Sequence, residues 1–67
     1  MSEIIIKRLK ENEGRDATIF LSNGFRFFGK IRECDENYLE FFDYKSNAIR
    51  IFKISEINEI EIKEVGK

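Results

Sequence analysis

The sequence predicts a mainly β domain, in which a short N-terminal helix is followed by five short antiparallel strands that curl into a barrel. Three observations predict this fold. Hydrophobic and polar residues alternate with a period of two from Asp16 onward, Asn23-Gly24 interrupts the alternation as a hairpin turn would, and Gly29 lies inside the strand that follows. The 67 residues contain no proline and no repeat, so we expect one domain over 1–67.

The helix is predicted over residues 2–12, SEIIIKRLKEN. Three apolar residues recur there at helical spacing, Ile5, Ile6 and Leu9. Ser2 is a candidate N-cap, and Gly14 is a candidate stop after the last turn. The β-branched run Ile4-Ile5-Ile6 would also suit a strand, so the sequence leaves that alternative open.

The barrel is expected over about residues 16–64 and begins with a hairpin. The first strand carries Ala17, Ile19 and Leu21 on one face. Asn23-Gly24 is the strongest short hairpin signal and predicts a two-residue type I′ turn, since both residues tolerate positive φ. The second strand, about 25–34, is expected to put Phe25, Phe27, Gly29 and Ile31 on one face and Arg26, Phe28, Lys30 and Arg32 on the other. A glycine at position 29 predicts a bulge, a bend or a close approach of two backbones.

Turn residues divide the rest of the barrel into three more strands. A tight connection is predicted at 35–37, a third strand at 38–42 and a polar loop at 43–47. The fourth strand is predicted at 48–54, and a break at Ser55 precedes a last strand that contains Ile57, Ile60 and Ile62.

Composition limits the possible functions. The chain has no histidine and one cysteine, Cys34, so no nucleophile with a nearby base and no metal-binding cluster can be assigned, and we expect neither an enzyme nor a cofactor. Cys34 is expected to be a small buried residue. No apolar run approaches the ~20 residues of a membrane span, so a cytoplasmic location is the default expectation. A net charge of −1 argues against bulk attraction to nucleic acid but allows a local basic surface.

The seven phenylalanines and two tyrosines are numerous for so small a chain, and three cations share a strand with them, Arg26, Lys30 and Arg32. Exposed rings stack unpaired bases, at about 1–3 kcal/mol per base, while neighbouring cations bind phosphates. The alternative is that the rings fill the core and a subunit interface and that the cations form a solvated face. Composition alone does not decide between the two. Two interpretations are also open for residues 7–10 of the helix, KRLK: a second basic patch, or a helix face in contact with solvent.

Strand edges suggest how the domain is completed. A chain of this length buries only about 60% of its surface, so oligomerisation is the remaining route to extra stability. The last strand carries Glu59 and Glu61, which would repel phosphate, and it is better suited to be an edge. Pairing it with the fourth strand of a second copy, repeated head to tail, would close a ring.

Residues 19–35, IFLSNGFRFFGKIRECD, are similar to the first motif of the Sm-like (LSm) superfamily, with alternating apolar residues, Asn-Gly, a second glycine and an aspartate. Within that superfamily the sequence resembles the Hfq family most, through the helix before the first strand and through residues 52–55, FKIS. The resemblance covers nearly the whole chain. It implies a strongly bent, five-stranded SH3-like barrel (the Sm fold) capped by the helix, and a homo-oligomeric ring, a hexamer rather than a heptamer.

The resemblance also implies binding of single-stranded RNA. In the Hfq family the face away from the helices takes purine-rich RNA, at positions that fall here on Phe20, Gly24, Phe25, Arg26 and Phe27. Lys30 is expected to meet phosphate, and Phe28 stands where the family carries a glutamine.

The pore on the helix side binds uridines in the Hfq family, and its Tyr-Lys-His signature reads Phe52-Lys53-Ile54 here if the segment is slid. Lys53 is then the pore candidate, whereas an ungapped alignment moves it off the lysine position. The histidine is missing in either alignment, and Glu36 and Glu3 make the pore acidic, so A-rich RNA is expected in preference to U-rich RNA. The first hypothesis is an RNA chaperone and post-transcriptional regulator. The alternative is an Sm-fold structural or protein-interaction ring that has lost RNA binding.

Overall fold

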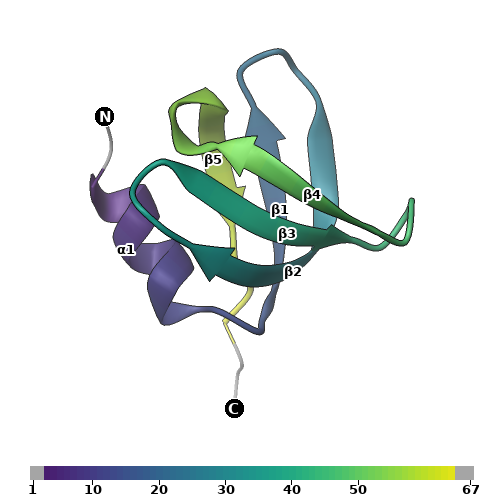
Figure 1. Ribbon diagram of the computed structural model, residues 1–67, viewed down its shortest axis with the longest axis horizontal. Coiled ribbons are helices and arrows are strands. Elements are labelled where there is room, and N and C mark those ends of the chain that lie inside the picture. The colour runs from purple at the N-terminus through teal and green to yellow at the C-terminus, as the bar shows by residue number, and fades with distance from the viewer. Residues whose placement is uncertain (1–2, 65–67) are drawn as a thin grey trace.

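The structure is a computed structural model that describes residues 3–64 (Figure 1). A helix is followed by five strands and one 3₁₀ turn: α1 Glu3–Glu11, β1 Asp16–Leu21, β2 Arg26–Cys34, β3 Tyr38–Asp43, β4 Ala48–Lys53, η1 Ile54–Glu56 and β5 Ile57–Glu61. The predicted mainly β fold is therefore confirmed, with every predicted element present.

Helix α1 is amphipathic and packs its apolar side against the barrel. Leu9 is fully buried, and Ile5 and Ile6 pack against the core at half-buried positions. This burial explains why the isoleucine run forms a helix and not a strand. Gly14, which has a φ of +90°, turns the chain after the helix, and its N–H donates to the Ile31 carbonyl at 2.6 Å. The candidate N-cap Ser2 lies outside the described residues.

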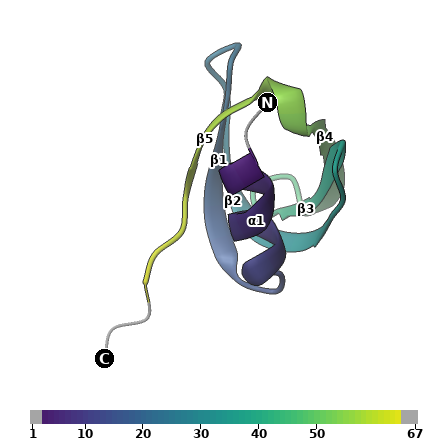
Figure 2. The same cartoon turned by 90° about the vertical axis from the view of Figure 1, so that its left-hand side faces the viewer.

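The five strands form one antiparallel sheet in the order β4-β3-β2-β1-β5. The sheet curls around the core, α1 lies at one end of the barrel, and the β3–β4 loop lies at the other (Figures 1 and 2). Because β4 and β5 are the outermost strands, each has one edge without a strand partner within residues 3–64. These two free edges are the ones that the sequence predicts.

Gly29 sits where β2 and β3 approach most closely. It pairs with Asp43, and a Cβ atom added to it would lie 1.8 Å from the Phe42 carbonyl oxygen. The expected close backbone approach is therefore confirmed. Further along β2 the register shifts between Ile31 and Glu33, which turns Cys34 into the core and leaves it 6% exposed.

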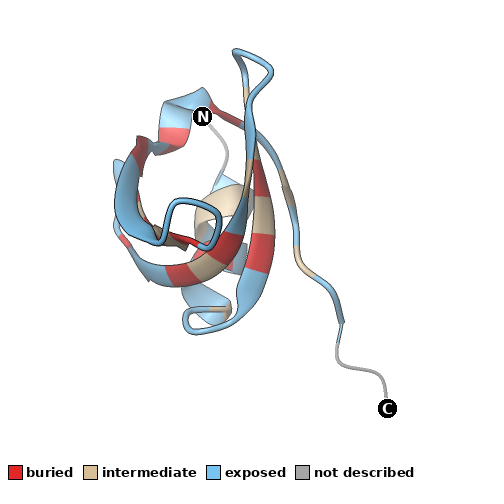
Figure 3. Ribbon diagram, turned by 90° about the vertical axis from the view of Figure 1, so that its right-hand side faces the viewer, coloured by how far each residue is buried: buried red, intermediate tan, exposed pale blue. Residues whose placement is uncertain are grey.

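The core lies between the two walls of the curled sheet and under α1 (Figure 3). Its buried apolar residues come from every element: Leu9, Ala17, Ile19, Ile31, Cys34, Leu39, Phe41, Phe52, Ile54 and Ile57. The alternation predicted for β1 and for positions 27–31 of β2 matches this burial. No helix of the described residues is long and apolar enough to cross a membrane.

The turn of the β1–β2 hairpin differs from the predicted type. The Leu21 N–H donates to the Phe25 carbonyl at 2.8 Å, and the Gly24 N–H donates to the Leu21 carbonyl at 3.0 Å. These bonds enclose a three-residue loop in which Gly24 has a φ of +94° and Asn23 does not have positive φ. The predicted type I′ turn is therefore wrong, because this longer loop needs positive φ at its last position alone. As a result, Phe25 precedes β2 and does not join Phe27 on the inward face.

Asp43 is a second difference. It was expected in a polar loop, but it ends β3 and is only 3% exposed. The predicted break at Ser55 is confirmed as η1, which redirects the chain from β4 into β5.

Candidate nucleic-acid interface

The tip of the β1–β2 hairpin presents Phe25 to solvent. This side chain is 64% exposed, although it is large and apolar. Its N–H donates to Oδ1 of Asn23 at 3.0 Å, and Ser22, one residue further back in the loop, donates through both N–H and Oγ to the Glu56 carbonyl at 2.9 Å. The tip is thus tied to η1, and Phe25 is held in an exposed position by a defined loop.

Arg26, exposed at the start of β2, is paired with Phe20 of β1. Phe20 is half-buried and is itself paired with Glu59 of β5 on its other side. Phe27, the next predicted site residue, is half-buried and packs against the core. Its ring lies 5.1 Å from that of Phe52, centroid to centroid.

A hollow of about 1010 Å³, here called the tip hollow, collects several of these side chains. Of the predicted site residues it is lined by Phe20, Arg26 and Phe27. Its lining also includes residues of the β3–β4 segment that the sequence did not point to, Tyr44, Lys45, Ser46 and Arg50. Gly24 and Phe25 stand at the hairpin tip, outside this lining.

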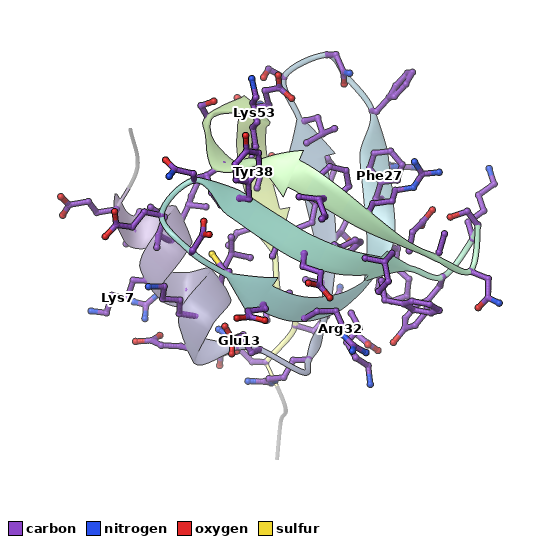
Figure 4. The ribbon with its side chains drawn as sticks, in the orientation of Figure 1. Lys7, Glu13, Phe27, Arg32, Tyr38 and Lys53 are labelled. Atoms are coloured by element: carbon purple, nitrogen blue, oxygen red, sulfur yellow. The ribbon has the colours of Figure 1, made fainter. Side chains whose placement is uncertain are left out.

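Two other predicted residues lie in separate hollows. Lys30 lines a hollow beside β1, here called the side hollow, together with Asp16, Phe28 and Tyr44. Lys53 ends β4 opposite Tyr38 of β3, and both line a smaller hollow of about 270 Å³ with Ser55 (Figure 4). The predicted set is therefore divided between the hairpin tip with its hollow, the side hollow and the end of β4.

One of the residues that line the tip hollow is Asp43, a buried carboxylate that forms an ion pair with Arg50. The Ser46 hydroxyl donates to Oδ2 of Asp43 at 2.7 Å, and Arg50 Nε donates to the same oxygen at 3.1 Å. These bonds, the Ser46 hydroxyl first, lower the pKa of Asp43 below its ordinary value. The Arg50 guanidinium also lies 5.1 Å from the centre of the Phe27 ring, within cation–π range. Arg50 therefore already has two partners within the chain, the Asp43 carboxylate and the Phe27 ring.

Other polar groups of the barrel have structural roles. Oδ1 of Asp35 accepts from the backbone N–H groups of Asn37 and Tyr38, which forms the β2–β3 turn and lowers the pKa of Asp35. Burial raises the pKa of the Cys34 thiol, so the cysteine is not activated. Within residues 3–64 there is no group of three or more acidic, cysteine or histidine side chains placed to hold a metal ion.

The residues that the sequence missed share one cause. Tyr44 and Lys45 belong to a loop whose position depends on how β3 lies over β2, where the Tyr44 N–H donates to the Phe28 carbonyl at 3.1 Å. An aromatic residue followed by lysine inside a polar loop was the available signal. A loop that packed against nothing would gain little from an aromatic side chain.

A crystal structure at 1.55 Å of a protein described as the pleiotropic translational regulator Hfq is similar to this chain, with a TM-score of 0.78. The match covers 90% of this chain and 100% of that one, at 21% sequence identity. No protein-family model matches the sequence, and no curated protein matches it significantly. From its helix, its five-stranded order and this similarity, the chain has an Sm-like fold similar to that of Hfq.

Proposed function

We propose that this chain forms a homo-oligomeric ring that binds single-stranded RNA and acts, without catalysis, as an Hfq-like RNA chaperone or post-transcriptional regulator. The observation that carries the proposal is the exposed Phe25 beside the exposed Arg26 at the tip of a rigidly tied hairpin. An exposed ring beside a cation is the arrangement that stacks a base and meets its phosphate.

The Arg26 side chain makes no ion pair within the described residues, so its charge is available to a phosphate. Lys30 and Lys53 are likewise free of ion pairs within residues 3–64, and they extend the basic surface away from the tip. A-rich RNA is proposed over U-rich RNA, because Lys53 stands near Glu36 and no histidine is present.

The ring supplies affinity through repetition. Identical shallow sites on one assembly turn weak single-base contacts into avidity. The free edges of β4 and β5 are the surfaces proposed to pair between copies, and a hexamer is proposed in preference to a heptamer.

The test is the affinity of Phe25→Ala for a short A-rich oligonucleotide, measured by fluorescence anisotropy. Loss of one stacked base should weaken binding at least about fivefold, the equivalent of about 1 kcal/mol. Phe25→Tyr keeps the ring and should bind like the natural sequence. Light scattering should show the same assembly for all three proteins, and an unchanged affinity of Phe25→Ala would refute the site.

The second candidate function is an Sm-fold ring that binds protein and not RNA. The observation that favours it is the apolar outer face of β4, where Ile49 is 48% and Ile51 is 64% exposed. Added salt separates the two functions. Binding through phosphates weakens steeply as salt rises, whereas an apolar interface keeps or gains strength.

A further inference from the structure

An aromatic pair lies between the tip hollow and the side hollow, away from the hairpin tip. Phe28 is 53% exposed and Tyr44 is 40% exposed, and their ring centroids are 5.5 Å apart in an edge-to-face arrangement. Both side chains therefore keep exposed surface that a base could contact. Both side chains line both hollows, so the pair forms the ridge that separates them.

The pair is held in place by bonds at both ends. The Tyr44 hydroxyl donates to Oδ1 of Asp16 at 2.5 Å, which raises the pKa of the tyrosine. The Tyr44 N–H donates to the Phe28 carbonyl, and the Phe42 ring lies 5.8 Å from that of Tyr44. A base that stacked here would therefore meet rings that are already ordered, which lowers the entropic cost of binding.

The charges around the pair favour an anionic occupant. Arg26 and Lys45 line the tip hollow, Lys30 lines the side hollow, and none of the three is in an ion pair within residues 3–64.

Most of the carboxylates in the two hollows already have partners. Asp16 accepts from Tyr44, Asp43 is held by Ser46 and Arg50, and Glu61 lies 3.6 Å from the Lys63 ammonium. Asp16 and Glu64, which line the side hollow, are in no ion pair among the described residues. Six cations nevertheless line the two hollows against four carboxylates, so the net charge around the two rings is positive: Arg15, Arg26, Lys30, Lys45, Arg50 and Lys63 against Asp16, Asp43, Glu61 and Glu64.

We propose that Phe28 and Tyr44 form a second base-stacking site for single-stranded RNA, on the side of the barrel, which a strand bound at Phe25 reaches by crossing the tip hollow. This inference rests on the proposed function, since it assigns the path of the same RNA. Arg26 would serve both sites, and Lys30 and Lys45 would hold the phosphates on either side of the ridge.

The first experiment uses Phe28→Trp, because the chain contains no tryptophan and the new ring becomes the only indole. Its fluorescence is followed while an A-rich oligonucleotide of about 16 nucleotides is added. Phe25→Trp reports the hairpin tip in the same way. Ile4→Trp places an indole on α1, at a residue that is 61% exposed, and serves as the control. Saturable quenching at positions 25 and 28, but not at position 4, is the expected result.

The second experiment separates stacking from apolar contact. Phe28→Leu keeps an apolar side chain without an aromatic face and should lower the affinity for the same oligonucleotide at least about fivefold, while Phe28→Trp should retain it. Quenching at position 25 with none at position 28, or full affinity in Phe28→Leu, overturns the second site and leaves the proposed function standing. No RNA binding by the natural sequence overturns both. The exposed position of Phe28 means that circular dichroism should show all these variants folded.

Discussion

At Gly29 the backbones of β2 and β3 come so close that a Cβ atom would lie 1.8 Å from a backbone oxygen. Backbone cannot rotate away as a side chain can, so Gly29→Ala must push the strands apart and should lower the free energy of unfolding by about 1–3 kcal/mol or more. Urea denaturation measures the loss. Gly14→Ala is the control, because nothing lies within 4 Å of its Cβ position and it reports the cost of positive φ alone. Equal losses in the two variants would contradict the steric argument.

Asp43 should make the stability of the folded state depend on pH in the acidic range. Its pKa is lowered from 3.8 in the folded state, by the Ser46 hydroxyl first and by Arg50, so its contribution is present above pH 3.8 and is lost as the pH falls through the folded-state pKa. As the pH is lowered from about 5 to about 2, the melting temperature should therefore fall less steeply for Asp43→Asn than for the natural sequence. Asp35, whose pKa is also lowered, remains in both proteins and gives a slope that they share. Identical curves would show that Asp43 does not titrate in the way its bonds require.

Among the elements, those with a clear period were predictable. Ala17 and Ile19 lie on the same face of a strand, and burial of that face in the core follows directly from the pattern. The hairpin was predictable too, but its loop was not, because Asn23-Gly24 fits two loop lengths that differ only in where the closing hydrogen bonds fall. That difference of one residue decides whether Phe25 is on the inward face or in solvent.

The candidate site was predictable only in part. Phe20, Arg26 and Phe27 come together because they face each other across one hairpin, which is a local relation. Tyr44 joins them through the packing of β3 on β2, a relation that no period in the sequence expresses. The burial of Asp43 was not predicted for a similar reason: its partners Ser46 and Arg50 become its neighbours only after the β3–β4 loop has formed.

At the scale of the whole molecule, the two free edges differ in charge. β4 carries Lys53 and β5 carries Glu59, and neither is in an ion pair within residues 3–64. The other two charges of these strands, Arg50 and Glu61, are paired with Asp43 and Lys63. Opposite charges on unlike edges favour pairing of β4 with β5 of a second copy and disfavour pairing of like edges. The assembly that this favours is head to tail, which agrees with the proposed ring.

Ile51→Lys tests that assembly. The side chain is 64% exposed on an edge strand, and a lysine there is a common device by which natural edges avoid pairing. Native mass spectrometry should show a defined oligomer for the natural sequence and a shift to smaller species for the variant. Ile4→Lys, at a 61% exposed residue on α1, should leave the mass unchanged. A natural sequence that stays monomeric at high concentration would remove the basis for the ring.

If copies pair through β4 and β5 as proposed, the two unlike edges of the sheet also give the growing assembly a direction. Each copy added through β4 and β5 leaves the same two edges free, unless the rotation between copies returns to the first one. Closure and endless extension into a filament thus differ only in the angle between neighbours. Because β2 and β3 approach closely at Gly29, a substitution that pushes them apart would change the curl of the sheet and, in the proposed assembly, would favour fibres over circles.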